Sequence, residues 1–215
     1  MSAPGAAARG PRDQGTRASR HHTARGPMGL AGRIRLPAAR LRARFGRTPE
    51  RPWIVPQAVG WLGRRMRPDW NVVELGSGRS TVWLGRRAAR VIAYEDDESW
   101  LARARNMVAA ADLENVEIRQ LPVTDFAGEV AALEDGSLDL LVIDFLESPE
   151  AERVSSVRAG RAKVRPGVYL LLDDSDRPSY AAAYELLAGW PERRFTGVKD
   201  EWPEACETAI FRRPG

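Results

Sequence analysis

The stretch VVELGSGRST, residues Val72 to Thr81, decides the fold of this chain. An apolar run ends in an acid and is followed by two glycines one residue apart, which is typical of a buried strand that turns tightly into a helix. Gly76 and Gly78 can adopt positive φ and carry no Cβ, so a ligand can lie against the backbone. We expect Ser80 or Thr81 to cap the helix, whose first amides favour negative charge. The stretch therefore predicts a nucleotide-binding turn.

The spacing of the glycines bears on which ligand this turn binds. The dinucleotide fingerprint has the form G-x-G-x-x-G, and Thr81 stands where its third glycine belongs, which disfavours NAD. Glu74, at the end of the strand just before the first glycine, suits S-adenosylmethionine, because an acid can bind the ammonium group of that molecule directly or through water. An ordinary strand-to-helix turn without a ligand would also explain the two glycines.

A second acid follows the next apolar run. Residues 90–94 lead to Glu95, which comes 21 positions after Glu74 and is followed by Asp96 and Asp97. An acid about 20 residues beyond a glycine turn, at the tip of the adjacent parallel strand, is placed to bind the two hydroxyls of a ribose. The alternative is that these three acids only cap the helix that follows, where negative charge suits the first turn.

Strand and helix patterns alternate along the chain, and the run at 138–143, which is apolar apart from Asp139, is typical of a parallel sheet covered on both faces. The last two strands read as a hairpin, which would place an antiparallel strand in the sheet. The sequence predicts one α/β domain, a three-layer Rossmann-like sandwich whose seven-stranded, mostly parallel sheet has one antiparallel C-terminal strand. Strands are predicted at 71–75, 90–94, 116–121, 138–143, 168–172, 194–197 and 208–212, and helices at 53–66, 80–87, 98–111, 149–163 and 179–188.

Acids concentrate at the ends of the predicted strands. A single acid after a strand is usually a helix cap or a turn residue. Ligands of open α/β sheets bind at the carboxyl ends of the strands, so several acids at successive ends indicate a binding site. The acids concerned are Glu74, Glu95, Asp144, Asp173 and Asp174.

Four motifs together resemble the class I, Rossmann-like S-adenosylmethionine-dependent methyltransferases, and most of all a group of small bacterial members. The resemblance covers about residues 51–213. It departs from the family pattern at Asp174, where the family has Asn. The motifs are Pro52-Trp53 near the domain start, the Glu-x-Gly-Ser-Gly-x-Ser-Thr turn at 74–81, Glu95 with Trp100, and Asp173-Asp174-Ser175-Asp176.

The resemblance implies S-adenosylmethionine as cofactor and a set of residues that bind it. It places residues 123–125 against the adenine and Asp144 beside the methyl donor and the acceptor. Asp144 or Asp174 would act as general base or hold substrate hydroxyls by hydrogen bonds. The implied cofactor-binding residues are Glu74, Gly76, Ser77, Gly78, Ser80, Thr81, Glu95, Asp96, Thr124 and Asp144.

Asp144, Asp173 and Asp174 also resemble the acids of the metal-dependent catechol-type methyltransferases. A hard cation such as Mg²⁺ on these oxygens would position an acceptor hydroxyl and lower its pKa. The sequence leaves open whether a metal is used.

The implied reaction is methylation of a hydroxyl on a small molecule or a glycan. Trp53 and the loop at 198–206, with Trp202, are candidates for acceptor recognition, and the Asn-Pro-Pro-Tyr segment of enzymes that methylate nucleic-acid amino groups is absent. An NAD-dependent oxidoreductase is the first alternative, although no Tyr-x-x-x-Lys set is present. A non-catalytic adaptor tethered by a basic arm is the second.

The charge of the chain divides sharply at residue 50. Residues 1–50 hold eleven Arg against Asp13 and Glu50, a net charge of +9, which leaves −5 of the total +4 for residues 51–215. The catalytic part therefore has no global electrostatic footprint for nucleic acid. Residues 1–28 have too few large apolar side chains to fold and are predicted to be disordered.

Residues 29–50 are predicted to be a basic linker or a surface helix, and residues 51–215 the methyltransferase domain. The stretch 30–45 can lie on anionic lipid, bind an acidic partner or dock on the domain. With Cys206 as its single cysteine and no apolar block of signal-peptide type, the chain is predicted to be cytoplasmic.

Overall fold

The computed structural model describes residues 51–146, 151–199 and 204–215. The predictions of a disordered tail at 1–28 and of a basic linker or surface helix at 29–50 lie outside the described residues. Trp202, the candidate for acceptor recognition, lies outside them too.

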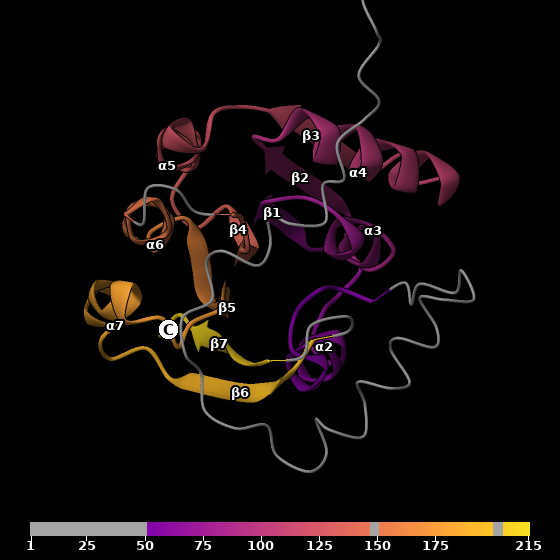
Figure 1. The fold of residues 1–215 in the computed structure, drawn as a ribbon. Helices are drawn as coiled ribbons and strands as arrows, with labels where there is room; N and C mark the ends of the chain where they lie inside the picture. The colour runs from indigo at the N-terminus through magenta and orange to yellow at the C-terminus, as the bar shows by residue number, and fades with distance from the viewer. Residues whose placement is uncertain (1–50, 147–150, 200–203) are drawn as a thin grey trace, which may run out of the picture.

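A twisted sheet of seven strands forms the middle layer (Figure 1). The strands are β1 (Asn71–Leu75), β2 (Arg90–Glu95), β3 (Val116–Gln120), β4 (Leu138–Ile143), β5 (Val164–Asp173), β6 (Glu192–Val198) and β7 (Ala205–Arg212). Their spatial order is β3-β2-β1-β4-β5-β7-β6, and the first five of these are parallel. Strand β7 runs antiparallel to both β5 and β6, which confirms the single antiparallel C-terminal strand.

Helices cover both faces of the sheet, as a three-layer sandwich requires (Figure 1). One face carries α2 (Pro56–Gly63), α3 (Arg79–Gly85) and α4 (Glu98–Ala110), and the other carries α5 (Phe126–Ala131), α6 (Glu152–Gly160) and α7 (Ala181–Leu186). Two short 3₁₀ turns, η3 (Val123–Asp125) and η4 (Pro178–Tyr180), precede α5 and α7. None of the described helices is long and apolar enough to cross a membrane.

The core lies at the centre of the sheet. All six residues of β4 are buried, as are four of the five in β1, because both strands are flanked by strands and covered by helices. Asp139 is the polar exception within β4: its Oδ2 accepts the backbone N–H of Asn71 at 2.8 Å, and Arg165 pairs with its other oxygen. The buried carboxylate of Asp139 thus holds the amino end of β1 next to β4 by its hydrogen bond with Asn71.

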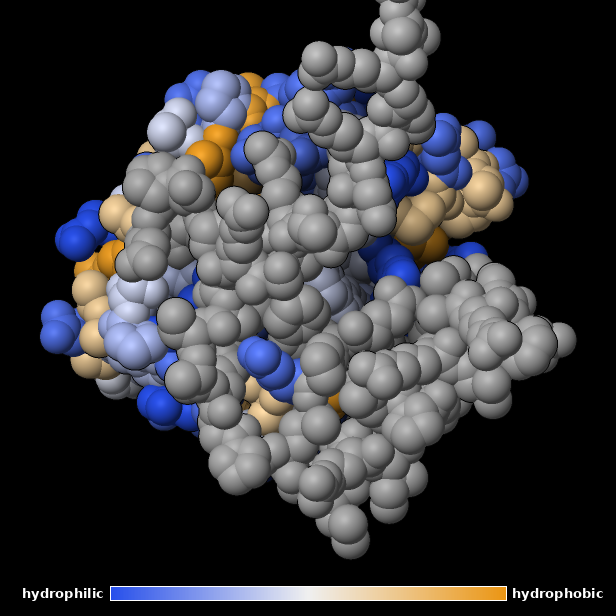
Figure 2. Space-filling model, viewed as in Figure 1, coloured by the Kyte–Doolittle hydropathy of each residue, from blue (hydrophilic) through white to orange (hydrophobic). Residues whose placement is uncertain are grey.

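The outer surface of the described part is ordinary for a water-facing domain. Figure 2 shows hydrophilic residues around much of the visible rim, with smaller hydrophobic areas between them. Cys206 is buried in β7.

Candidate functional site

The carboxyl ends of the parallel strands bring the predicted acids to one edge of the sheet. Strand β2 lies on one side of β1 and strand β4 on the other, so the order of strands across the sheet changes direction between β1 and β4. Such a switch point is where open α/β sheets bind ligands. The two strand ends are joined there, since the backbone N–H of Asp144 donates to the carbonyl of Leu75 at 2.9 Å.

The glycine turn crosses this switch point. Gly76 has φ +97°, and a Cβ at this position would fall on the carbonyl oxygen of Asp144. Gly78 has φ +155° and is itself the N-cap of α3. The N-cap is therefore neither Ser80 nor Thr81, but Thr81 caps the helix from position N3 of a capping box. Both lie in its first turn, where Thr81 Oγ1 accepts the backbone N–H of Gly78 at 2.8 Å.

Glu74 is completely buried below this turn. Its Oε2 accepts the hydroxyl of Thr81 at 2.6 Å, while its Oε1 has no hydrogen-bond partner among the described residues. Burial raises the pKa of Glu74 to about 7. A buried carboxylate oxygen without a donor costs free energy, so the site is incomplete until a donor reaches Glu74.

Glu95 ends β2 and ties the glycine turn to that strand. Its Oε2 accepts the N–H of Ser77 at 3.0 Å and its hydroxyl at 2.7 Å, and its Oε1 accepts the N–H groups of Asp96 and Asp97 at 3.2 Å. Asp97 caps α4 by accepting the N–H of Trp100 at 2.9 Å, so helix capping holds for this acid. Glu95 itself binds the turn rather than the helix.

Two of the predicted cofactor-binding residues are exposed to solvent, unlike the buried Glu74 and Glu95. Asp96 and Thr124 are exposed at the carboxyl ends of β2 and β3. The Thr124 hydroxyl donates to its neighbour Asp125 at 3.2 Å. Their side chains follow the tips of adjacent strands, and the Asp96 carboxyl interacts with that of Glu95.

Large exposed apolar side chains gather at the same edge. Among the described residues they are Trp53 and Trp100, each 38% exposed, and Leu146, which is 60% exposed. The Trp100 indole N–H donates to the carbonyl of Ser77 beside the glycine turn, and Leu146 follows Asp144 by two residues. Exposed apolar surface beside buried charges is typical of a binding site for an organic molecule.

A buried ionic cluster follows strands β4 and β5. Asp173 and Asp174 both pair with the Lys199 ammonium, and Arg177 Nη2 lies 2.6 Å from Asp174 Oδ2. Arg153 lies 3.8 Å from Asp144 and donates to the carbonyls of Phe145 and Asp173, at the ends of both strands. Asp174 adopts φ +51°, a conformation that Asn and Asp tolerate better than most residues.

The charges in this cluster separate the pKa values of its acids. Burial and the neighbouring Asp173 raise the pKa of Asp144 well above its usual range. Burial would also raise the pKa of Asp174, but the charges of Lys199, Arg153 and Arg177 hold it well below that range. At neutral pH, therefore, Asp144 takes up a proton far more readily than Asp174.

Sequence reasoning missed Lys199, Arg153 and Thr208 as members of this cluster. Thr208 in β7 donates to Asp173 Oδ1 at 2.6 Å. The composition alone sets Lys199 apart, because the chain has two lysines against 31 arginines and Lys199 is one of the two. Its partners are 25 and 26 residues away in sequence, so no local spacing reveals the contact.

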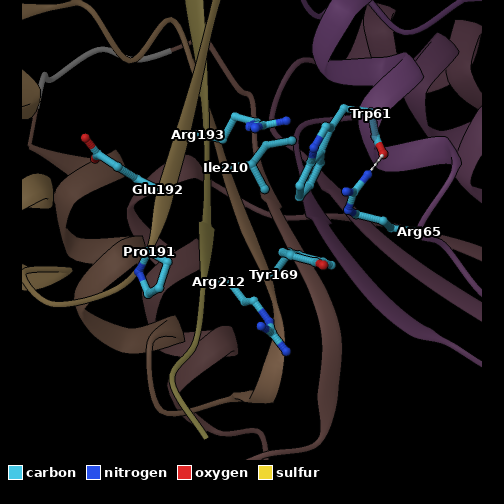
Figure 3. Close-up of a pocket in the computed structure, with 8 residues that line it drawn as sticks. All are labelled: Trp61, Arg65, Tyr169, Pro191, Glu192, Arg193, Ile210 and Arg212. Carbon is cyan, nitrogen blue, oxygen red and sulfur yellow. Dashed lines mark hydrogen bonds between the residues drawn. The ribbon is translucent and has the colours of Figure 1, made fainter.

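A hollow in the described part of the chain lies elsewhere (Figure 3). It has a volume of about 300 Å³ and is lined by Trp61, Tyr169 and three arginines among others. Tyr169 precedes Asp173 by four residues of β5, roughly 13 Å along the strand toward its amino end. None of the predicted site residues lines this hollow, so we do not assign the ligand site to it.

Comparisons with known proteins find similarity to methyltransferases. A family model described as a methyltransferase domain matches residues 73–175, from the middle of β1 to just beyond β5. A ubiquinone biosynthesis O-methyltransferase of Acinetobacter baumannii (strain AYE) is 27% identical over 135 residues, which are 63% of this chain. The matched region is 54% of that relative, so the chain spans about half the length of the curated relatives it matches.

Solved structures share the fold at low identity. An O-methyltransferase from Bacillus cereus in complex with SAH has a TM-score of 0.58 at 18% identity, and the match covers 87% of this chain and 92% of that one. The N-methyltransferase NodS from Bradyrhizobium japonicum WM9 has a TM-score of 0.57 at 15% identity and covers 74% and 94%. These two act on different atoms, so the shared fold does not identify the acceptor.

Proposed function

We propose that the chain is a class I S-adenosylmethionine-dependent methyltransferase, which binds its cofactor at the β1–β4 switch point and methylates a hydroxyl group of a small molecule; the match of residues 73–175 to a methyltransferase domain supports this. The observation that carries the proposal is the buried Oε1 of Glu74, a carboxylate oxygen without a donor among the described residues, beside a turn in which Gly76 and Gly78 carry no side chain. An ammonium group is the donor that this oxygen suits best, because it also offsets the negative charge.

The residues around the turn fit the rest of the cofactor. Gly76 and Gly78 carry no Cβ, and a Cβ there would meet the Asp144 backbone and the Trp100 ring, so the glycines let the turn pack closely against those two residues. Glu95 stands at the tip of β2, where a ribose is expected. Its oxygens are occupied by donors from the chain itself, and of these the Ser77 hydroxyl is the one that can rotate away and give its place to a ribose hydroxyl. Asp96 and Thr124 would border the ribose and the adenine.

Asp144 is the better of the two candidates for a general base. When bound, S-adenosylmethionine supplies a methyl group already activated by its sulfonium, so the protein has to align the acceptor and remove one proton. Its raised pKa makes the ionised Asp144 a stronger base than Asp174. Asp174 is held ionised by Lys199 and Arg177 and orients those cations instead.

Three features support a small organic acceptor. Trp53 and Leu146 offer exposed apolar surface. Residues 51–215 carry a net charge of −5, which disfavours nucleic acid. The matching Acinetobacter protein is named as an O-methyltransferase. A glycan hydroxyl is the other acceptor that the sequence allows.

The test is a transfer assay with radiolabelled S-adenosylmethionine and the full chain. Phenols and catechols, saccharides, and RNA serve as three separate acceptor sets, and Asp144→Asn is the matched variant. We expect label to reach the phenolic set and the variant to lose at least about a hundredfold in rate while it still binds the cofactor. Labelling of RNA alone, or an unchanged rate in the variant, would contradict the proposal.

A further inference from the structure

Lys199 lies in a position that few lysines occupy. It directly follows β6 and is only 7% exposed, and its Nζ contacts carboxylates on either side. Strands β6 and β5 run in the same direction, since both are antiparallel to β7, so the lysine reaches the same edge as Asp173 and Asp174. Lysine is almost never buried unless it is paired, and here the pairing is with two acids at once.

The carboxylate oxygens of Asp173 and Asp174 all have donors from the chain. Asp173 Oδ1 accepts the Thr208 hydroxyl at 2.6 Å, and Asp173 Oδ2 accepts the Lys199 ammonium. Asp174 Oδ1 accepts Lys199 at 3.0 Å, and Asp174 Oδ2 accepts Arg177 at 2.6 Å. A hard cation would have to displace these donors to reach the oxygens that it prefers.

The formal charges of the cluster are balanced as well. With all three acids ionised, Asp144, Asp173 and Asp174 supply three negative charges, and three cations face them: Arg153, Arg177 and Lys199. A proton on Asp144, whose pKa is raised, makes the cluster more positive still. Adding a divalent ion would leave two uncompensated positive charges in a buried place, which is costly. No three His, Cys, Asp or Glu side chains in the described part of the chain are arranged to hold a metal ion. The acids that suggested Mg²⁺ therefore do not fit it while Lys199 is in place.

We propose that the Lys199 ammonium stands in for a divalent cation at this edge, so that the chain transfers methyl groups without a metal and uses Lys199 to position the acceptor oxygen. The inference rests on the proposed function. Two of the three N–H groups of the ammonium are taken by Asp173 and Asp174, and the third has no acceptor among the described residues. The ring of Trp53, which is 38% exposed, lies 5.7 Å from Nζ.

A fixed ammonium can do part of what a metal does. It attracts the acceptor oxygen and stabilises the negative charge that develops there as the proton leaves. It does not act as the base, because Asp173 and Asp174 hold the pKa of Lys199 well above its usual range against the opposing effect of burial. Lys199 is thus a positioning group, and Asp144 is the proton acceptor beside it.

The experiment compares Mn²⁺ binding by the full chain and by Lys199→Ala. Mn²⁺ is chosen because its binding is seen directly by electron paramagnetic resonance. We expect the wild-type chain to leave millimolar Mn²⁺ free and its Tm unchanged. In Lys199→Ala the three carboxylates face only two arginines, so we expect Mn²⁺ to bind and to raise the Tm by about 5 °C.

Lys163→Ala is the matched control. Lys163 also pairs with an acid, the exposed Asp135 at 2.7 Å, so its loss removes a lysine ion pair without opening the cluster. This variant should behave as wild type toward Mn²⁺. Lys199→Arg, which keeps the charge, should also leave Mn²⁺ free.

Two results would overturn the proposal. One is stoichiometric Mn²⁺ binding by the wild-type chain that Asp174→Asn abolishes. This measurement does not need Lys199→Ala, so it tests the proposal even if that variant does not fold. The other is a folded Lys199→Ala chain that leaves Mn²⁺ free. Binding of S-adenosylhomocysteine is measured in parallel by calorimetry. If the wild-type chain does not bind it, the methyltransferase function is refuted, whereas the Mn²⁺ measurements are independent of this result.

Discussion

At the scale of single residues, Glu74 is the group whose chemistry changes most when a ligand binds. It is fully buried, its pKa is raised to about 7, and one of its oxygens has no donor among the described residues. An ammonium bound beside it favours the ionised form. Glu74 must therefore lose its proton when the cofactor binds below pH 7.

The first prediction is a pH dependence of cofactor affinity. Only the carboxylate form of Glu74 binds the ammonium well, so affinity is full above pH 7 and falls as the pH drops below it, by up to about tenfold per unit. Calorimetry with S-adenosylhomocysteine between pH 5 and pH 8 measures this. Glu74→Gln should bind more weakly at pH 8 and show no such slope. An equal slope in the variant would assign the titration to another group.

Gly76 is the residue at which the backbone leaves least room. An added Cβ meets the Asp144 carbonyl, and φ is +97°. We expect Gly76→Ala to lower the free energy of unfolding by about 3 kcal/mol or more and to abolish S-adenosylhomocysteine binding. Gly136→Ala is the control: φ there is +70°, but nothing lies within 4 Å, so only the backbone strain of about 1 kcal/mol remains. Urea denaturation that gives equal losses for the two variants would contradict this account.

The residues of the turn could be predicted from the sequence because their chemistry is local. Gly76, Gly78 and Glu74 lie within five positions of one another. The strand-to-helix pattern implies the positive φ of the two glycines and the burial of Glu74. Lys199 could not be predicted in this way, because its role depends on β6 lying two strands from β5 in the finished sheet. The N-cap of α3 could not be predicted, because Ser80 and Thr81 are both residue types that favour this position, yet Gly78 occupies it. Thr81 lies at N3, where its hydroxyl accepts the N–H of Gly78 and donates to Glu74.

At the scale of elements, α6 holds two strands together at the site. Its Arg153 is 3% exposed and donates to carbonyls that follow β4 and end β5. We expect Arg153→Met to cost about 3 kcal/mol or more, because it leaves buried carbonyls and Asp144 without their donor. Arg158→Met on the exposed side of the same helix should change stability by no more than about 0.5 kcal/mol. Thermal unfolding of the two variants checks the contrast, and similar losses would refute a special role for Arg153.

The strands were predicted more accurately than the helices. Strands β1 and β4 have the bounds that their apolar runs predict, because an uninterrupted run must be buried on both faces. Helix α5 was missed, since its six residues are too few to show a helical period. The predicted helix at 53–66 is found as α2 at Pro56–Gly63, and it begins at a proline that lacks the N–H needed further inside a helix.

At the scale of the whole molecule, charge is distributed unevenly between the two parts of the sequence. The +9 of residues 1–50 against −5 for the rest predicts that any attraction to anionic lipid comes from the first 50 residues. We expect the full chain to bind vesicles rich in anionic lipid at low salt and to be released as salt rises, and the chain shortened to 51–215 to stay unbound. Vesicle sedimentation at several salt concentrations measures this, and binding by the shortened chain would contradict it.

The overall topology followed from the order of strands and helices, because right-handed crossovers allow few sheets with this pattern. The position of the site followed from the topology, since the acids at four strand ends must then meet at one edge. The contacts inside the site did not follow, because they depend on which donors reach each carboxylate.

The most direct test of the central claim is calorimetric titration of the full chain with S-adenosylhomocysteine at pH 8, with NAD as the competing ligand. We predict one site per chain for S-adenosylhomocysteine, a large loss of affinity in Glu74→Gln, and no heat with NAD. A folded chain that ignores S-adenosylhomocysteine, or that binds NAD at the same edge, would contradict the account.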